Sequence, residues 1–544
     1  MTSAEVDLRY SVEQKQYIEF STKCDTKLLA TAGSGKTFCI IHHIRHLIDR
    51  NIYSPHQIFM LTFSRNAKDD FIMKMKKNKV DEVPVKNINT IDSFAWAIMG
   101  EDVARSIDVS ILSYSLFRLL IEIKAVKQKQ LTNPDLTVDD IGCICPIIHA
   151  FGISFEDIWK KLSRIKCIFV DEAQDLNEVQ YNILLHLKDV CEAELNLIGD
   201  PNQNIYQFRS SSDKYLVEYP AQTFELTRNY RSKGHIVEFC SHLRPYQTSE
   251  ITYETGEQQE SNTNQANKSF NDQSTSLSSS LFPVPTTTST TTKSVLDVTF
   301  YSYSNTASFE NYILSILHFF KAKMIPLHKV AILAPTRGYL RTVKGISKYK
   351  GLCYIANLLY KNDIPFQQFY NDMGRSTSIS TRDSTDTSND SIADCDSVKV
   401  SYKMKKGHIN LMTYTASKGL EWDYVIVVDA DAHLISRWEY DINKFNAEKY
   451  LLYVACSRPR KNLIIFTKHR YTNPWFKDVP NSKYKLARIC PDELEFFDST
   501  KLFKTSMNEK KLEENENKMD VDEKKDVLSP SNECSIPPSH QNPP

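Results

Sequence analysis

A glycine-rich turn that leads into a lysine and a threonine is the first stretch of this sequence able to do chemistry. It consists of Ala30, Thr31, Ala32, Gly33, Ser34, Gly35, Lys36 and Thr37. Glycines let the backbone N–H groups of such a turn point inward, and the following helix adds partial positive charge. The pattern is typical of a phosphate-binding loop, although Ala30 replaces its first glycine. Lys36 would reach the β- and γ-phosphates of a nucleotide, and Thr37 would bind Mg²⁺.

Two carboxylates follow an apolar run that has the length of a buried strand. The run is Cys167-Ile168-Phe169-Val170, and Asp171 and Glu172 come directly after it. We expect Asp171 to hold Mg²⁺ and Glu172 to orient and deprotonate an attacking water. The alternative is that Asp171 and Glu172 are only a solvated acidic turn. Their position after an apolar strand and downstream of the phosphate loop favours a catalytic role.

Further polar and aromatic residues follow the next strand-like runs. The amide of Gln203 is suited to sensing a terminal phosphate, and Phe208 lies on a polar stretch where a nucleobase could stack. The alternative interpretation of Phe208 is a core aromatic that packs beneath the loop. A basic and aromatic cluster, Arg228 to Ser232, comes after another strand.

Alternating strands and helices must position these residues. Apolar strand patterns at 27–30, 57–63, 167–170 and 195–198 are separated by helical patterns, which predicts a parallel α/β sheet. Ligands of such sheets bind beyond the carboxyl ends of the strands, where the polar residues above are found. A helix capped by Ser11 carries Gln14, whose amide could contact an adenine edge. The Leu/Ile stripe between 112 and 123 is interpreted as core packing.

Bulk composition restricts the class of protein. The 544 residues suggest several domains, and equal numbers of acidic and basic residues mean that any nucleic-acid contact is local. No apolar run is long enough to span a membrane, and the N-terminus has no signal-peptide pattern. Twelve cysteines lack a C-x₂-C pair, which favours buried thiols over a zinc site. We therefore expect a soluble intracellular protein, nuclear or cytoplasmic.

The ordered motifs resemble those of UvrD/Rep-type superfamily 1 helicases. The residues that carry this resemblance are Gln14, Ala30–Thr37, Asp171–Asp175, Gly199–Arg209, Asn229–Ser232, Thr413–Asp423 and Leu452–Arg460. They keep the order of the family and span the chain from Gln14 to about Asn462.

The resemblance implies two RecA-like α/β domains with ATP and Mg²⁺ in the cleft between them. It implies 3′-to-5′ movement on single-stranded DNA, with duplex unwinding in repair, replication or recombination. The residues implied for catalysis are Lys36, Asp171, Glu172, Gln203, Arg231 and Arg458. Those implied for the nucleotide are Gln14, Ala30–Thr37, Phe38, Tyr230, Arg231, Glu421 and Arg458, with Thr37 and Asp171 on the metal. Those implied for the strand are Phe63, Thr90, Phe208, Arg209 and Thr415.

The sequence departs from the family pattern in four places. The large helical insertion of the second domain is expected to be reduced or absent, because the corresponding interval is mainly Ser, Thr and Asp. Phe38 stands where relatives often have arginine, Phe208 replaces a tryptophan, and Thr415 replaces a histidine. Both phenylalanines keep a flat face for stacking.

Composition and motif positions predict the domain organisation. The first domain comprises 1–99 and 165–225, interrupted by a small helical insertion at 100–164. The second comprises 226–248, 294–373 and 398–490. The segments 249–293, 374–397 and 491–544 are rich in polar residues and are predicted to be disordered, where loading or repair partners could bind.

Three other functions stay open at this stage. One is an RNA helicase, because motor contacts go mainly to backbone and base faces. Another is an ATP-binding scaffold or switch with little unwinding, against which Lys36, Glu172 and Arg458 argue. The motor half of a helicase–nuclease is disfavoured, because the C-terminal tail, although charged, shows no carboxylate/lysine cluster of the nuclease type.

Overall fold

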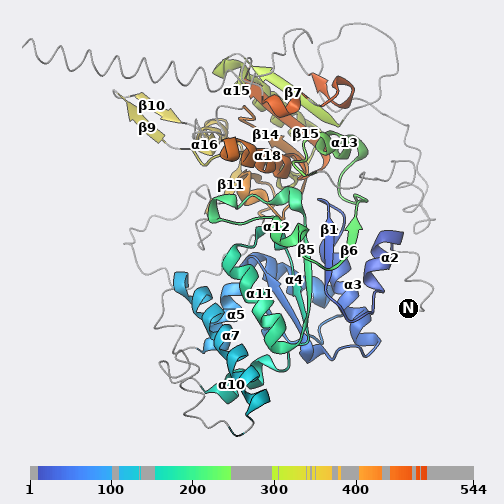
Figure 1. The fold of residues 1–544 in the computed structure, drawn as a ribbon. Coiled ribbons are helices and arrows are strands. Elements are labelled where there is room, and N and C mark those ends of the chain that lie inside the picture. Colours follow the sequence, from blue (N-terminus) through green and yellow to red (C-terminus); the bar gives the residue numbers. More distant parts are fainter. Residues whose placement is uncertain are drawn as a thin grey trace, which may run out of the picture.

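A computed structural model gives the fold of most of the chain (Figure 1). It describes residues 10–100, 109–133, 135, 154–246, 297–303, 305–338, 340–343, 346–349, 351–369, 378–380, 404–431, 442–468, 473–477 and 479–486. Within this part of the chain, no helix is long and apolar enough to cross a membrane.

The first sheet has six strands in the order β3-β2-β4-β5-β1-β6, and every neighbouring pair is parallel. The strands are β1 (Thr26–Ala30), β2 (Ile58–Thr62), β3 (Ile88–Thr90), β4 (Cys167–Val170), β5 (Glu194–Gly199) and β6 (Gln222–Leu226). The helices around them are α2 (Val12–Ile18), α3 (Lys36–Asp49), α4 (Arg65–Lys77), α5 (Ile91–Met99) and α11 (Glu178–Cys191). The predicted parallel α/β sheet is therefore confirmed.

Both faces of this sheet are covered, as its strand sequences require. In β4, Ile168 and Val170 belong to one apolar cluster, while Cys167 and Phe169 belong to the cluster on the opposite face. A strand buried on both faces reads as a continuous apolar run rather than an alternating one. That is why the run before Asp171 could be identified from sequence.

The helical segment predicted at 100–164 contains α7 (Val109–Thr132) and α10 (Phe155–Leu162). The Leu/Ile stripe of α7 is fully buried against α5 and α11, in the same apolar cluster as strands of the first sheet. The interpretation of this stripe as core is confirmed. These two helices share the core of the first sheet and extend it at the bottom of Figure 1.

The second sheet has eight strands in the order β12-β11-β13-β8-β14-β15-β7-β16. They are β7 (Val298–Tyr303), β8 (Val330–Ala334), β11 (Phe366–Phe369), β12 (Ser378–Ser380), β13 (Ile409–Thr413), β14 (Trp422–Val427), β15 (Pro459–Lys468) and β16 (Lys485–Leu486). The accompanying helices are α13 (Gly234–His242), α15 (Thr306–Ala322), α16 (Gly351–Lys361) and α18 (Ile442–Cys456). All pairs are parallel except β11 with β12.

Alternate residues of the second sheet also face two apolar clusters, so this sheet has helices on both sides. Val330 and Ile332 of β8 point to one cluster, and Ala331 and Leu333 point to the other. A separate hairpin, β9 (Leu340–Val343) and β10 (Ile346–Tyr349), extends from this unit at the left of Figure 1. The fold class is thus two parallel α/β units, as the sequence indicated.

The disorder predicted at 374–397 is wrong for three residues. Ser378–Ser380 form β12, which pairs antiparallel with β11 at the edge of the second sheet. A polar segment can join a sheet edge because backbone hydrogen bonds, rather than side-chain burial, hold the pairing. The rest of that interval, and the predicted disordered segments 249–293 and 491–544, lie outside the described residues.

Candidate nucleotide-binding and catalytic site

The glycine-rich turn joins β1 to α3 and approaches the second unit closely. Gly33 and Gly35 have φ of 78° and 89°, the left-handed region that favours glycine. A Cβ on Gly33 would lie 2.8 Å from Cβ of Arg231 and 2.8 Å from Nδ2 of Asn229. Gly33 is therefore needed for its conformation and for this close packing. Lys36 Nζ donates to the carbonyl of Ala30 at 3.1 Å, which places the ammonium over its own loop.

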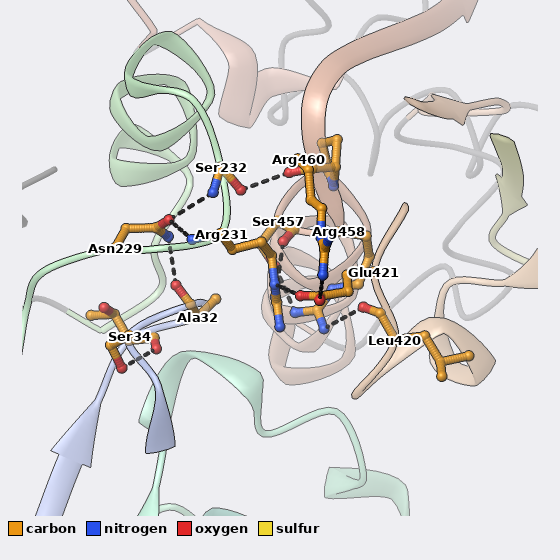
Figure 2. A network of polar contacts seen from close by, with 12 residues as sticks. Ala32, Ser34, Asn229, Arg231, Ser232, Leu420, Glu421, Ser457, Arg458 and Arg460 are labelled. Carbon is orange, nitrogen blue, oxygen red and sulfur yellow. Dashed lines mark hydrogen bonds and ion pairs between the residues drawn. The ribbon is translucent and has the colours of Figure 1, made fainter. Parts of the chain in front are cut away.

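Residues of the second unit hold the loop from the other side (Figure 2). Asn229 Nδ2 donates to Ala32 O at 2.7 Å, and Tyr230 N donates to Gly33 O at 2.9 Å. The Asn229 side chain also accepts from the backbone N–H groups of Arg231 and Ser232, both at 2.9 Å. The loop conformation is thus determined jointly by both units.

Gln14 is brought to the same loop by α2. Ser11 caps this helix reciprocally with Gln14, as predicted, and Gln14 Nε2 donates to Ser34 O at 3.2 Å. Phe38 lies in the first turn of α3, with its ring 4.2 Å from that of His42 and 5.8 Å from that of Tyr10. The structure therefore places Gln14 and an aromatic group beside the phosphate loop, where an adenine subsite was expected.

Asp171 and Glu172 follow β4, at the same edge of the sheet as the loop. Glu172 is a non-glycine residue with φ of 57°, and its Oε2 accepts from Gln174 Nε2 at 2.5 Å. Burial and the adjacent Glu172 raise the pKa of Asp171. Burial alone would also raise the pKa of Glu172, but Lys418 and Lys36 together lower it below its ordinary value. Glu172 is therefore held as the anion of the pair.

Asp171 and Thr37 are chemically suited to hold Mg²⁺. Both offer oxygen donors, which this hard cation prefers. Burial and the charge of Glu172 raise the pKa of Asp171, and a divalent cation bound beside this carboxylate would lower that pKa again. The residues present therefore fit the metal that the sequence indicated.

Arg458 lies at the end of α18 and crosses to the first unit. Its Nη2 donates to Gln203 Oε1 at 3.1 Å, and its Nε donates to Val454 O at 2.7 Å. Gln203 is itself oriented by a 2.7 Å bond from Nε2 to Asp200 Oδ2. Arg458 is only 1% exposed. Burial, and to a smaller extent the positive charge of Arg231, lowers the pKa of Arg458 to about 9. Arg458 is therefore a buried cation aimed at the nucleotide side of the interface.

Arg231, Glu421 and Arg460 form an ion-pair group beside Arg458 (Figure 2). Arg231 Nε donates to Glu421 Oε2 at 2.5 Å, and Arg460 Nη2 pairs with Glu421 Oε1. Burial would raise the pKa of Glu421, but these two arginines lower it to about 2. Tyr230, the neighbour of Arg231, has an exposed ring. The structure thus brings Tyr230, Arg231, Glu421 and Arg458 together across from the phosphate loop.

Three of the residues expected to contact a strand, Phe63, Phe208 and Arg209, lie around the ring of Tyr206 on the first unit. Tyr206 stacks on Phe63 with ring centres 4.8 Å apart, and Phe208 lies 6.0 Å from Tyr206. The guanidinium of Arg209 is 5.9 Å from the centre of the Tyr206 ring and 5.8 Å from that of Phe208. We call Phe63, Tyr206 and Phe208 the aromatic ladder. Phe208 is 70% exposed, so its interpretation as a core aromatic is wrong.

Two other residues that were expected to contact single-stranded DNA, Thr90 and Thr415, lie outside this aromatic group. Thr90 is buried, and its hydroxyl caps α5 through Ser93 N at 3.1 Å and Ser93 Oγ at 2.8 Å. Thr415 is half-buried in the short 3₁₀ helix η7 (Thr415–Ser417), which follows β13.

Lys418 is the prominent residue of this interface to which the sequence assigned no role. It belongs to the second unit, yet its Nζ pairs with Asp175 Oδ2 and donates to Gln203 O at 2.8 Å. Only its position within the motif Thr413–Asp423 could have pointed to Lys418 from the sequence. A lysine in a polar loop is usually solvated, and its partners are distant in sequence.

Comparisons with known proteins agree with this arrangement. Residues 14–209 match a family model described as an AAA domain, and residues 385–470 match that of a UvrD-like helicase C-terminal domain. The chain is 32% identical over 522 residues to R568 of Acanthamoeba polyphaga mimivirus, whose name describes an ATP-dependent DNA helicase. It is 26% identical over 274 residues to the ATP-dependent DNA helicase Rep of Buchnera aphidicola subsp. Schizaphis graminum.

A further relative is the ATP-dependent DNA helicase PcrA of Staphylococcus epidermidis, 25% identical over 283 residues. The match to the mimiviral protein covers 93% of this chain and 61% of the relative. The matches to Rep and PcrA cover 40% and 41% of this chain, and 41% and 38% of those relatives. The chain thus spans less than two thirds of the length of each relative.

Proposed function

This chain belongs to the UvrD/Rep-like helicase family, and on that premise we propose that it is an ATP-driven motor on single-stranded DNA. It hydrolyses ATP between its two α/β units, moves 3′-to-5′ along the strand and separates duplex ahead of it. DNA repair, replication or recombination is the setting that we propose for this activity.

One observation carries the proposal: groups suited to phosphoryl transfer converge from both units. Lys36, Asp171 and Glu172 come from the first unit, while Arg458 reaches from the second to Gln203 of the first. Hydrolysis of a γ-phosphate depends chiefly on positioning and on compensation of charge. A site divided between two units is completed when they close and is broken when they separate, which is how hydrolysis can drive movement.

The roles that we propose follow from each environment. Lys36 and the loop N–H groups bind the β- and γ-phosphates, and Glu172, held as an anion, orients the attacking water and accepts its proton. Gln203 and Arg458 contact the terminal phosphate, where a guanidinium can donate to two oxygens at once. Thr37 and Asp171 would hold Mg²⁺, which would compensate the charge of the phosphates. Phe38 and Tyr230 offer their ring faces to the adenine.

The aromatic ladder is the proposed strand site. An exposed aromatic beside an arginine suits stacking of bases together with contact to the phosphate backbone. No hydrogen-bonding pattern for particular base edges is needed for such a track. Sequence-independent binding of single strands is therefore part of the proposal.

The test is the ATP hydrolysis rate of the protein with single-stranded DNA, with single-stranded RNA and without polymer. We expect strong stimulation by DNA, and none in Lys36→Ala, which lacks the charge that neutralises the phosphates. Strands carrying a fluorophore at either end would then report the direction of movement. Stimulation by RNA alone, movement towards the 3′ end, or normal turnover in Lys36→Ala would contradict the proposal.

A second variant separates chemistry from binding at Glu172. Glu172→Gln should retain nucleotide binding while hydrolysis falls roughly a hundredfold or more, the scale expected on losing a general base. Binding is measured with a fluorescent nucleotide and hydrolysis by release of phosphate. Loss of nucleotide binding in this variant would assign Glu172 to structure instead of catalysis.

A further inference from the structure

Strands β9 and β10 belong to a stretch of the second unit whose sequence is strongly basic. Between Ala334 and Gly351 the chain has no acidic residue and five basic ones, which are Arg337, Arg341, Lys344, Lys348 and Lys350. The whole chain has equal numbers of acidic and basic residues, so this excess of positive charge is local. A local basic patch lets a protein without net charge attract a polyanion. We call β9, β10 and the two residues between them the basic hairpin.

The strand register places two of these cations directly opposite each other. Arg341 of β9 pairs with Lys348 of β10, and Val343 pairs with Ile346 two positions further along. Residues two apart in a strand lie on the same face, so these two pairs share one face of the hairpin. Opposed residues have Cβ atoms only about 5 Å apart, and like charges at that separation destabilise the pairing. An anion bound at this face would relieve the repulsion.

The base of the basic hairpin is attached firmly to the second unit. Gly351 has φ of 58°, and a Cβ on this residue would lie 2.7 Å from Thr336 O, so only glycine fits there. Leu352 N donates to Thr336 O at 3.3 Å, and Cys353 N donates to Arg337 O at 3.0 Å. A two-stranded hairpin is only marginally stable by itself in water. These contacts at its base therefore support a projection that its own strands would not maintain.

The basic hairpin leaves the second sheet at the edge that also contributes to the proposed strand site. Strand β8 leads into it and ends at Ala334, whose carbonyl accepts from Tyr414 N at 2.9 Å. The chain after Tyr414 continues through η7 to Lys418, whose Nζ lies 5.4 Å from the centre of the Tyr206 ring in the aromatic ladder. Figure 1 shows β9 and β10 extending away from the body of the protein, to the left of α16.

We propose that the basic hairpin binds the phosphate backbone of double-stranded DNA. None of the four paired residues on the face of Arg341 and Lys348 is aromatic, so this face offers no ring on which an unpaired base could stack. In a duplex the bases stack on one another, and cations contact the phosphates whatever the sequence. A two-stranded ribbon also fits the width of the major groove. Single strands bind instead at the aromatic ladder, with its exposed Phe208 ring.

The experiment measures binding of a short blunt duplex and of an oligothymidine single strand to the full-length protein, without nucleotide and over a series of salt concentrations. Arg341→Gln/Lys348→Gln removes both opposed charges. We expect its duplex affinity to fall roughly tenfold or more near 0.1 M salt. The slope of log affinity against log salt concentration should become shallower by about 2, because each phosphate contact contributes about 0.9. Its affinity for the single strand should stay near that of the unaltered protein.

Lys321→Gln/Lys323→Gln is the matched control, because it removes two exposed charges at the end of α15 in the same unit. Its affinity for both ligands should remain near that of the unaltered protein. An equal loss of duplex affinity in this control would show that overall charge, and not the basic hairpin, attracts the duplex, and would overturn the proposal.

Lys348→Glu separates DNA binding from the folding of the hairpin. A glutamate opposite Arg341 replaces a repulsive cross-strand pair by an attractive one, so the hairpin should be at least as stable. Duplex affinity should nevertheless fall as far as in Arg341→Gln/Lys348→Gln, since the net charge changes by the same amount. Unchanged duplex affinity in these two variants would overturn the proposal. Equal losses for duplex and single strand would assign the hairpin to single strands and would overturn it as well.

The inference rests on the proposed function only in taking DNA as the polymer, and the two are tested separately. Both hairpin variants should keep the hydrolysis that single-stranded DNA stimulates, because the nucleotide site and the aromatic ladder are unaltered. If the unaltered protein shows no such stimulation, the proposed function fails, while the duplex affinities still decide this inference. If stimulation is normal and duplex affinity does not depend on Arg341 and Lys348, this inference alone fails.

Discussion

Two arginines separated by one residue have opposite environments at the interface. Arg458 is almost completely buried and donates to Gln203, whereas the side chain of Arg460 is 51% exposed and pairs with Glu421. An arginine that binds a flexible phosphate backbone needs access to solvent, while one that completes a phosphoryl-transfer site does not. The burial of Arg458 therefore favours the catalytic role over contact with the strand.

Arg458→Ala should retain nucleotide binding and lose roughly a thousandfold in turnover, the lower end for such an arginine. Its affinity for single-stranded DNA without nucleotide should barely change. These quantities are measured by nucleotide titration, steady-state hydrolysis and strand binding at several salt concentrations. Arg460→Ala is the matched control and should lose far less turnover. Recovery of full turnover by Arg458→Ala at saturating DNA would indicate a strand contact instead.

Helix α3, which follows the phosphate loop, is bonded to the end of α2 by a buried histidine. His43 is 2% exposed, and its Nδ1–H donates to Ile18 O at 2.9 Å. Burial lowers its pKa from the ordinary 6.5 to about 4. Above pH 6.5 the ring is neutral in both the folded and the unfolded chain, so it has no effect on the pH dependence of stability. Between pH 6.5 and 4 only the unfolded chain binds the proton, which favours unfolding.

We therefore expect His43 to lower the free energy of unfolding by roughly 3 kcal/mol at pH 4, because its pKa falls from 6.5 in the unfolded chain to about 4 in the folded protein. His43→Gln keeps a polar donor without titrating. Relative to the unaltered protein, this variant should become more stable as the pH falls from 6.5 to 4. Urea unfolding at a series of pH values measures the difference, and the exposed His56→Gln serves as control. A difference that is constant with pH would exclude the linkage.

The loop after β5 presents the aromatic ladder, and its exposed end gives a direct test of strand binding. Phe208→Ala should weaken binding of single-stranded DNA by about 1–3 kcal/mol, the usual contribution of one stacked base. Because the ring is exposed, the melting temperature should change little. Tyr360→Ala on α16 is the matched control, since Tyr360 is 69% exposed in the second unit. Unchanged DNA affinity in Phe208→Ala would remove this residue from the strand site.

At the scale of the whole molecule, the residues on both sides of a long polar segment are bonded to the rest of the described protein. Before the insertion, Tyr246 N donates to Asn202 Oδ1 at 2.7 Å, and after it Asp297 pairs with Lys233 at 2.8 Å. Both flanks are thus attached to the body of the protein. The residues between them have little apolar content with which to offset the entropy of ordering.

Replacement of Glu254–Thr292 by a short Gly/Ser linker should leave DNA-stimulated hydrolysis largely intact. The measurement is the rate of phosphate release with and without single-stranded DNA, with Lys36→Ala in the shortened chain as the inactive control. Abolished stimulation in a correctly folded protein would mean that the segment contains a binding surface. The corresponding deletion in the second polar interval should spare Ser378–Ser380, because β12 belongs to the sheet.

The sequence alone determined the features that depend on near neighbours. The glycines of the phosphate loop, the cap of α2 by Ser11 and the apolar run of β4 are local signals, and all three are found in the structure. The two parallel α/β units followed from the repetition of such runs. Each of these signals depends on backbone conformation or burial within a few residues, which is what a sequence pattern reports.

Tertiary structure alone decided which residues meet across the two units. The pairing of Lys418 with Asp175 and the bond from Arg458 to Gln203 depend on how one sheet faces the other. The exposure of Phe208 depends on how the loop after β5 packs. The pairing of β12 is likewise set by an available sheet edge instead of by its own polar residues. Such contacts join residues far apart in the sequence, and their strength comes from burial that only the assembled interface creates.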